Sequence, residues 1–265
     1  MANPLKFKDT DGEESGKLIG KTVLITGAAK RVGRSIAREL HRAGANIAVH
    51  YRSSAEAAAA LTEELNELRP GSAFCLSADL LSVEALRQLV SETVEHFGQL
   101  DALVNNASSF YPTPFGHIDE AAWDDLTGSN LKAPLFLTQF AAPYLRAAHG
   151  AVVNITDIHA ERPFSGYPLY CAAKAGLLGL TRAMAIELAP EVRVNAVAPG
   201  PILWPESDPG SDFNADARER IIADTLLRHE GSPHDIAQTV RFLIDSAPYI
   251  TGQVINVDGG RTAHL

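Results

Sequence analysis

Two residues, Tyr170 and Lys174, have the types and the spacing that suit proton transfer. They open a helix-like stretch four residues apart, so their side chains lie on one helix face and reach the same bound molecule. A free tyrosine has a pKa near ~10, and a nearby ammonium group favours its phenolate form. We therefore predict that Lys174 lowers the pKa of Tyr170, which acts as a general acid. The alternative is a solvated pair, which is common at this spacing.

The elements that must position this pair follow a regular order. Short apolar runs alternate with longer amphipathic segments, which is typical of an α/β fold with a doubly wound, seven-stranded parallel sheet and helices on both faces, a single-domain Rossmann fold. We expect strands at residues 22–25, 47–49, 73–76, 102–104, 152–155, 192–197 and 254–257, and helices at 32–43, 55–68, 83–97, 121–147, 169–188 and 233–246.

The domain organisation is simple. A chain of 265 residues suits one large domain, which we place at residues 20–265 after a flexible arm at residues 1–19. Ser232, Pro233 and Asp235 form a capping-box pattern at the start of the last helix. Proline and glycine interrupt the chain after residue 199, so we expect a long substrate loop at about residues 199–219.

A turn that suits phosphate binding follows the first expected strand. Residues 26–33 lead directly into a helix, whose free amides and dipole favour a pyrophosphate group. Gly27 permits the tight turn and Gly33 permits close packing, and we expect Arg31 and Val32 to contact the same ligand. A dinucleotide site is the favoured interpretation, and a plain strand-to-helix turn is the alternative. Lys174 would then also hold the ribose hydroxyl groups.

The end of the second strand indicates which dinucleotide binds. Sites that prefer NAD have an acidic residue here, whereas this chain has His50, Tyr51, Arg52 and Ser53. Arg52, Ser53 and Arg31 are able to bind a 2′-phosphate through charge-assisted hydrogen bonds. We therefore predict that NADPH is the cofactor. The alternative is that Arg52 is only a solvated surface charge.

Other polar residues follow the third and fourth strands at the ligand-bearing edge of the sheet. Asp79 and Leu80 follow the third strand, and Asn106 and Ala107 follow the fourth, so we expect cofactor contacts from both segments. A helix N-cap for Asp79 and turn-forming amides for the asparagines are equally ordinary roles.

Composition and charge exclude several classes of function. The net charge of -9 argues against a nucleic-acid partner. Cys75 and Cys171 lie far apart without metal-type pairing, which argues against a disulfide framework or a metal site. No uninterrupted apolar stretch reaches the ~18 residues of a membrane span. These features favour a cytoplasmic protein with no membrane partner and a small-molecule substrate.

The residues together resemble the short-chain dehydrogenase/reductase family over nearly the whole chain, from Gly20 to about Gly260. The resemblance rests on the phosphate turn, the Asn105-Asn106-Ala107 segment, Asn130, Tyr170-x-x-x-Lys174, Pro199-Gly200 and the ending at residues 256–260. It implies hydride transfer to a bound substrate, cofactor contacts from Pro199 and Gly200, a homotetramer, and a role for Asn130 in a proton-relay water chain.

Two positions depart from the common pattern of that family. Arg31 replaces a glycine of the phosphate turn, and Asp157 replaces the catalytic serine thirteen residues before the tyrosine. A serine hydroxyl donates a hydrogen bond to a developing oxyanion, whereas an ionised carboxylate opposes that charge. Asp157 is better suited to anchor an N–H-rich heterocycle or to help protonate a ring nitrogen while a C=N bond is reduced.

At both of these positions the chain resembles the pteridine reductase branch of the family. It also resembles that branch in residues 26–35, 105–114 and 128–130. The resemblance implies that Phe110 stacks a pterin against the nicotinamide and that Ser108 contacts the cofactor or the pterin. Burial in the core is the alternative for Phe110. We predict NADPH-dependent reduction of biopterin, dihydrobiopterin, folate or dihydrofolate to the tetrahydro form, with Asp157, Tyr170, Lys174 and Asn130 as catalytic residues.

Other readings stay open. Residues 202–206 and the tail at 261–265 differ from that branch, so Leu203 and Trp204 are candidate pocket residues, with surface packing as the alternative. A carbonyl reductase for a 3-oxoacyl or sugar-like ketone shares every motif except Asp157 and the segment at residues 108–114. A non-catalytic dinucleotide sensor with the same fold is a third hypothesis, against which the Tyr170 and Lys174 pair argues.

Overall fold

The expected parallel sheet forms within the residues that the computed structural model describes, which are 18–204 and 213–263. Its strand order is β3-β2-β1-β4-β5-β6-β7. The strands are β1 (Thr22–Ile25), β2 (Asn46–Tyr51), β3 (Ala73–Ser77), β4 (Ala102–Asn105), β5 (Ala151–Ile155), β6 (Arg193–Pro199) and β7 (Val254–Val257). Of the predicted N-terminal arm, residues 1–17 lie outside the described residues, as do residues 205–212 of the predicted substrate loop.

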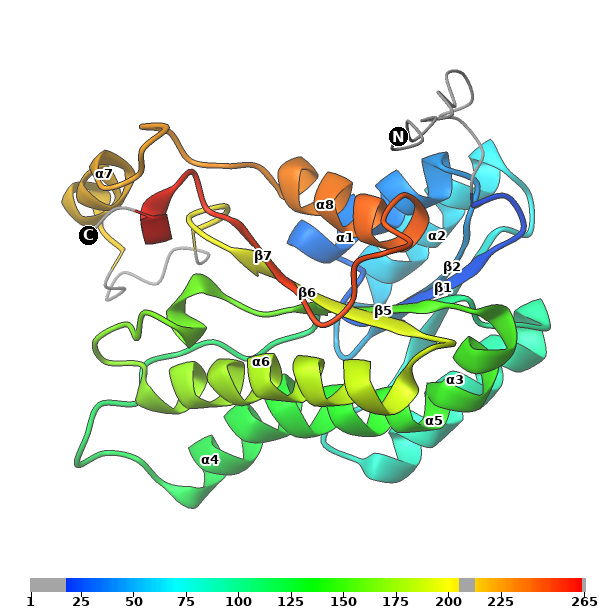
Figure 1. Cartoon of the computed structure of the whole chain (residues 1–265), viewed down its shortest axis with the longest axis horizontal. Coiled ribbons are helices and arrows are strands. Elements are labelled where there is room, and N and C mark those ends of the chain that lie inside the picture. Colours follow the sequence, from blue (N-terminus) through cyan, green and yellow to red (C-terminus); the bar gives the residue numbers. More distant parts are fainter. Residues whose placement is uncertain (1–17, 205–212, 264–265) are drawn as a thin grey trace, which may run out of the picture.

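Helices cover both faces of the sheet, as predicted (Figure 1). One layer holds α1 (Arg31–Arg42), α2 (Ala55–Leu68) and α8 (Pro233–Asp245), and the other holds α3 (Val83–Phe97), α4 (Glu120–Thr127), α5 (Ala133–Ala148) and α6 (Pro168–Leu188). The capping box of α8 is confirmed, since the Asp235 carboxylate accepts from the backbone N–H of Ser232 at 2.7 Å and from its hydroxyl at 2.8 Å.

The strands are buried because their side chains alternate between two helical layers. Val23 and Ile25 pack in the cluster with α1, α2 and α8, whereas Leu24 and Leu103 pack in the cluster with α3, α5 and α6. Burying one such side chain contributes roughly 1.5–3 kcal/mol. The same packing explains why α6 is long and apolar enough to resemble a membrane span, because its apolar residues contribute to the protein core.

Strand order also determines where a ligand binds. The chain runs outward from β1 to β2 and β3, and then crosses back so that β4 pairs with β1 on its other side. In open α/β sheets such a reversal leaves a crevice at the carboxyl ends of the strands. The turn after β1 and the segments after β2, β4 and β5 therefore meet at one edge of the sheet.

The prediction of one helix at residues 121–147 is wrong, because a π-helical segment at Gly128–Lys132 separates α4 from α5. A Cβ atom on Gly128 would lie 2.4 Å from the Leu81 side chain, so the backbone approaches closely there. Asn130 donates its amide N–H to the carbonyl oxygen of Leu126 at 3.0 Å, one helical turn earlier. A side chain that inserts into the hydrogen-bond ladder in this way locally widens a helix.

The long loop predicted at about residues 199–219 ends earlier than predicted. Strand β6 continues to Pro199, and α7 (Ala215–Ala223) begins before the predicted loop ends. Asn214 caps this helix by accepting the N–H of Ala217 at 2.9 Å. The helix was missed because it buries no residue in the protein, so its sequence carries no apolar period.

Candidate active site

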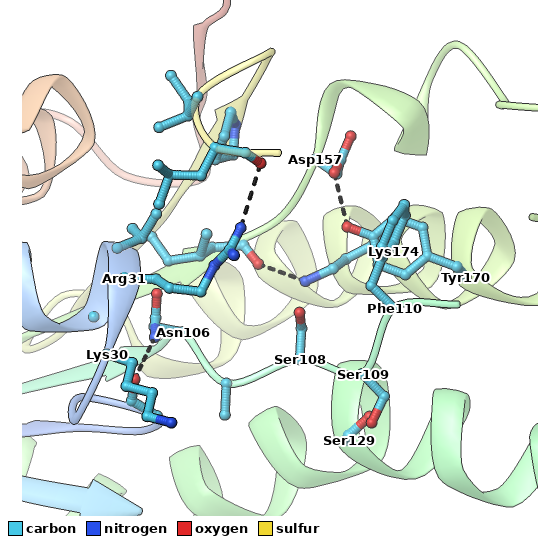
Figure 2. A pocket seen from close by; sticks show the side chains of 18 of the residues that line it. Lys30, Arg31, Asn106, Ser108, Ser109, Phe110, Ser129, Asp157, Tyr170 and Lys174 are labelled. Atoms are coloured by element: carbon cyan, nitrogen blue, oxygen red, sulfur yellow. Dashed lines mark hydrogen bonds between the residues drawn. The ribbon is translucent and has the colours of Figure 1, made fainter. Parts of the chain in front are cut away.

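A cleft with a volume of about 620 Å³ lies at the carboxyl edge of the sheet (Figure 2). Its lining comes from the turn after β1, the ends of β2 and β3, the segment after β4, the start of α6 and the segment after β6. Most of the predicted site residues line it: Gly27, Arg31, Val32, Gly33, His50, Tyr51, Arg52, Ser53, Asp79, Leu80, Asn106, Ala107, Ser108, Phe110, Asp157, Tyr170, Lys174, Pro199, Gly200, Leu203 and Trp204.

The start of α1 has the properties of a phosphate site. Its N-cap residue, Lys30, provides no side-chain cap, so the first amides of the helix remain available to a ligand. Gly27 has a φ of 63°, and a Cβ atom on Gly33 would lie 2.3 Å from the carbonyl oxygen of Gly27. Both glycines are therefore required for the close approach of turn and helix, and the donors present fit a dinucleotide pyrophosphate.

Thr26 and Asn106 hold this turn against the segment after β4. The Thr26 hydroxyl accepts the backbone N–H groups of Asn106 at 2.9 Å and Ala107 at 3.0 Å. In return, the Asn106 side chain donates to the carbonyl oxygens of Thr26 at 2.9 Å and Gly27 at 3.2 Å. Asn106 therefore shapes the turn, and the chain continues along the cleft through Ala107 and Ser108.

The residues after β2 differ in their surroundings. Arg52 and Ser53 are exposed at the rim of the cleft, and Arg52 pairs with Asp125 of α4 at 3.9 Å. The His50 side chain, in contrast, is buried, and both of its ring nitrogens have protein partners. Arg52 and Ser53 are thus accessible to an anionic group, whereas His50 forms part of the floor of the cleft.

Arg31 lines the cleft, and its side chain is bonded to another segment of the protein. Its guanidinium group donates to the carbonyl oxygens of Leu203 at 3.4 Å and Trp204 at 3.1 Å (Figure 2). It therefore connects the phosphate turn to the segment after β6, and its contact with the cofactor stays a prediction. Leu203 and Trp204 line the cleft, and the Trp204 indole N–H donates to Glu230 at 2.7 Å.

Asp79 and Gly200 complete two further parts of the wall. The Asp79 carboxylate accepts the N–H of Leu81 at 3.0 Å, while Ser82 is the N-cap of α3, so Asp79 is not the helix cap. A Cβ atom on Gly200 would lie 2.6 Å from the Cα atom of Asp258. The chain therefore packs tightly against the segment after β7 where it leaves β6.

The chemical centre consists of Asp157, Tyr170 and Lys174. The Tyr170 hydroxyl donates to the Asp157 carboxylate at 2.7 Å, and the other carboxylate oxygen accepts the N–H of His159 at 2.8 Å (Figure 2). Lys174 donates to the carbonyl oxygen of Ile155 at 2.9 Å, and its Nζ atom lies 5.7 Å from the centre of the Tyr170 ring. The predicted convergence of these three side chains is therefore present.

The electrostatics of Tyr170 differ from the prediction. Burial and the adjacent Asp157 carboxylate raise its pKa well above the ordinary value, although Lys174 was expected to lower it. Asp157 contacts the hydroxyl directly, whereas the ammonium group is directed to Ile155. Burial also lowers the pKa of Lys174 to about 8, an effect that Asp157 partly opposes. The protein groups therefore keep Tyr170 protonated at neutral pH.

Phe110 lines the cleft and is half-buried, so it is not sealed in the core. Its ring stacks on Tyr167, with a centroid distance of 4.7 Å and an interplanar angle of 11°, and meets Tyr170 edge to face at 4.7 Å. Two aromatic neighbours that the sequence does not reveal, Phe164 and Phe213, extend this wall. They come from irregular segments whose sequences carry no period, so only the tertiary structure brings them together.

Asn130 is buried behind the cleft rather than in its lining. Its side-chain amide donates to the carbonyl oxygens of Ser109 at 2.9 Å and Leu126 at 3.0 Å. It therefore supports the backbone next to Ser108 and Phe110, and its role in a water relay stays a prediction.

Comparisons with known proteins cover nearly the whole chain. A family model described as enoyl-(acyl carrier protein) reductase matches residues 27–262. The 3-oxoacyl-[acyl-carrier-protein] reductase FabG of Staphylococcus aureus (strain Mu50 / ATCC 700699) is 39% identical over 243 residues, which are 91% of this chain and 97% of the relative. Pteridine reductase 1 of Leishmania tarentolae is 38% identical over 277 residues, with 89% and 94% covered.

A solved structure is similar as well. The blue fluorescent protein from a metagenomic library, determined in complex with NADPH, superposes with a TM-score of 0.85 at 33% identity, over 92% of this chain and 99% of that chain.

Proposed function

The chain belongs to the short-chain dehydrogenase/reductase family and is an NAD(P)H-dependent reductase, and on that premise we propose that it uses NADPH to reduce a pterin ring. The observation that carries this proposal is the Asp157 carboxylate at 2.7 Å from the Tyr170 hydroxyl, in the wall of the cleft.

A carboxylate at this position favours a substrate that donates hydrogen bonds. It would repel the oxyanion that develops when a ketone is reduced, but it accepts N–H groups such as those of an aminopyrimidinone ring. One Asp157 oxygen is held by the N–H of His159, which fixes the orientation of the group. The site therefore selects a nitrogen heterocycle over a simple carbonyl compound.

Proton delivery follows from the protonated state of Tyr170. NADPH, when bound, would supply the hydride for the carbon of a C=N bond. The Tyr170 hydroxyl would give its proton to the nitrogen, and its raised pKa means that the hydroxyl is protonated at neutral pH. Lys174, buried beneath the tyrosine, is placed to bind the ribose hydroxyl groups and to stabilise the phenolate that forms.

The aromatic wall supports a flat substrate. Phe110, stacked on Tyr167, is held in a fixed plane beside the reactive pair. Stacking of a planar ring on such a side chain contributes about 1 kcal/mol beyond area burial and orients the ring for hydride transfer. Ser108, exposed next to it in the same segment, is available to contact the cofactor or the pterin.

The preference for NADPH rests on the rim of the cleft. Arg52 and Ser53 are exposed there, and the ion pair that Arg52 would exchange for a phosphate, with Asp125, is long at 3.9 Å. An exposed pair of this kind contributes little to stability, so its exchange for a 2′-phosphate is favourable. Arg31 is engaged with Leu203 and Trp204 and is not needed for this contact.

A second candidate is the reduction of a 3-oxoacyl thioester. It is favoured by the relatives, because several FabG proteins match this chain at 38–39% identity, alongside one pteridine reductase. The discriminating residue is Asp157, since a ketone reductase benefits from a neutral hydroxyl at that position.

A substrate panel tests these alternatives. Purified protein is assayed with biopterin, dihydrobiopterin, folate, dihydrofolate and 3-oxoacyl thioesters, with NADPH and NADH in parallel, for kcat/KM. We expect turnover of at least one pterin, with NADPH preferred. In Asp157→Ser, we expect the ratio of pterin to ketone kcat/KM to fall by about tenfold or more. Asp124→Ser, an exposed residue of α4, is the matched control and should leave the ratio unchanged.

Three other outcomes would each contradict one part of the proposal. NADPH oxidation with ketones but with none of the pterins would overturn the substrate assignment. A higher kcat/KM with NADH would overturn the cofactor preference. Binding of NADPH without oxidation in the presence of any substrate would favour the sensor hypothesis.

A further inference from the structure

His50, the fifth residue of β2, connects three neighbouring strand ends through one buried imidazole ring. Its Nδ1 atom accepts the backbone N–H of Gly27 at 3.1 Å, in the turn that follows β1. Its Nε2 atom lies 3.1 Å from the carbonyl oxygen of Ala78, which follows β3. The ring is therefore a bridge between the phosphate turn and the next two strands.

The partners define the state of the ring. A backbone N–H can only donate, so Nδ1 must accept, and a carbonyl oxygen can only accept, so Nε2 must carry the hydrogen. This is the neutral Nε2–H tautomer. Burial lowers the pKa of His50 and so favours the same neutral form.

Gly27 needs such a partner because of its position. Its φ of 63° turns the chain sharply, and a Cβ atom there would lie 3.1 Å from the Cα atom of Ala107. Asn106 holds the carbonyl oxygen of Gly27 at 3.2 Å, while His50 holds its N–H from the opposite direction. The backbone carbonyl of His50 also accepts the N–H of Ala28 at 2.9 Å. Without the imidazole, the part-buried Gly27 N–H would lose the acceptor that it has among the described residues.

We propose that His50 is a positioning residue, which holds the phosphate turn in its cofactor-binding conformation through Gly27 and does not itself bind the cofactor. The sequence placed His50 among the cofactor contacts, whereas its two ring nitrogens are both used within the protein. The proposal rests on the NAD(P)H site that the family shares and is independent of the identity of the substrate.

Substitutions at His50 test this role. His50→Leu removes both hydrogen bonds, and we expect the Kd of NADPH, measured by fluorescence titration, and its KM to rise by about tenfold, with kcat changed less than about threefold. His50→Asn keeps an acceptor near Nδ1 and should restore most of the affinity. His41→Leu is the matched control, because it removes the bond of another buried histidine, 2.7 Å from Ser72, outside the cleft lining.

Two results would overturn the proposal. One is NADPH affinity in His50→Leu that equals that of the wild type or of His41→Leu. The other is a loss of kcat with an unchanged Kd. If His50→Leu does not fold, His50→Asn and His50→Gln decide, because glutamine places its amide near Nε2 and leaves Gly27 unpaired. Tighter binding of NADPH by the asparagine variant supports the role, and equal binding by the two variants contradicts it.

Discussion

At the scale of single residues, the chemistry of the site depends on how burial and one carboxylate act on two neighbouring groups. Burial, the largest cause, raises the pKa of Tyr170 and lowers the pKa of Lys174 to about 8, and the adjacent Asp157 carboxylate raises both. Tyr170 therefore stays protonated at neutral pH, while Lys174 titrates closer to neutral pH than the tyrosine does.

A pH dependence follows from the pKa of Lys174, which lies at about 8. The ammonium form exists below that pH, so kcat/KM for NADPH should decline as pH rises through about 8. Asp157→Asn removes the charge that favours the ammonium form, so the decline should begin at a lower pH. Steady-state pH profiles of both proteins measure the shift.

In the wild type the tyrosine does not obscure this test, because its pKa lies well above the ordinary value. In Asp157→Asn the raising effect of the carboxylate is lost, but burial, the largest cause of the raised pKa, remains. An alkaline decline at the same pH in the wild type and in Asp157→Asn would show that Lys174 is not the group responsible.

At the scale of elements, the π-helical segment between α4 and α5 connects the helical layer that contains α3 to α6 with the cleft. It turns Asn130 inward, where the side chain holds the carbonyl oxygens of Ser109 and Leu126. The segment after β4, which carries Ser108 and Phe110, is therefore supported from behind by a helix irregularity.

Asn130→Ala leaves these two carbonyl oxygens without that donor. We expect the free energy of unfolding in urea to fall by about 1–3 kcal/mol, the cost of unsatisfied buried polar groups. Thr138→Val, at a buried α5 hydroxyl that has no hydrogen-bond partner among the described residues, is the matched control and should change stability little. Equal stability of Asn130→Ala and the wild type would contradict a supporting role for this residue.

At the scale of the whole molecule, several apolar side chains remain exposed on neighbouring helices of one layer. Leu135 and Tyr144 lie on α5, and Ile186 lies on α6. Exposed apolar side chains on neighbouring helices commonly contribute to surfaces between subunits. We propose that α5 and α6 contribute to the homotetramer that the family resemblance implies.

Light scattering after size-exclusion chromatography tests the assembly. We expect a mass about four times the 28.4 kDa of one chain, and a smaller mass for Tyr144→Asp. Leu68→Asp, at an exposed apolar site on α2 in the opposite layer, should keep the wild-type mass. A monomer in the wild type, or a mass unaffected by Tyr144→Asp, would count against the proposed surface.

The cytoplasmic location stays a prediction.

Much of the fold could be predicted because it depends on local signals. Buried parallel strands appear as short apolar runs, and each was located within a few residues of its position in the structure. The Ser232 and Asp235 cap marked the start of α8 for the same reason, since its hydrogen bonds join residues three apart. The helix break at Gly128 was not predicted, because Gly128 packs against Leu81, which is remote in the sequence. Helix α7 was not predicted, because it buries none of its residues.

The candidate site likewise has features that could be predicted and features that only the tertiary structure revealed. Helical spacing was enough to predict that Tyr170 and Lys174 share one face, and parallel strands bring their carboxyl ends and the phosphate turn to one edge of the sheet. The family resemblance added the expectation that Asp157 lies beside them. Only the tertiary structure decided what each group contacts. It assigned Arg31 to the segment after β6, His50 to Gly27, and the Tyr170 hydroxyl to Asp157 rather than to Lys174. Hydrogen-bond partners and burial depend on distances between segments that are remote in the chain, and no local pattern records them.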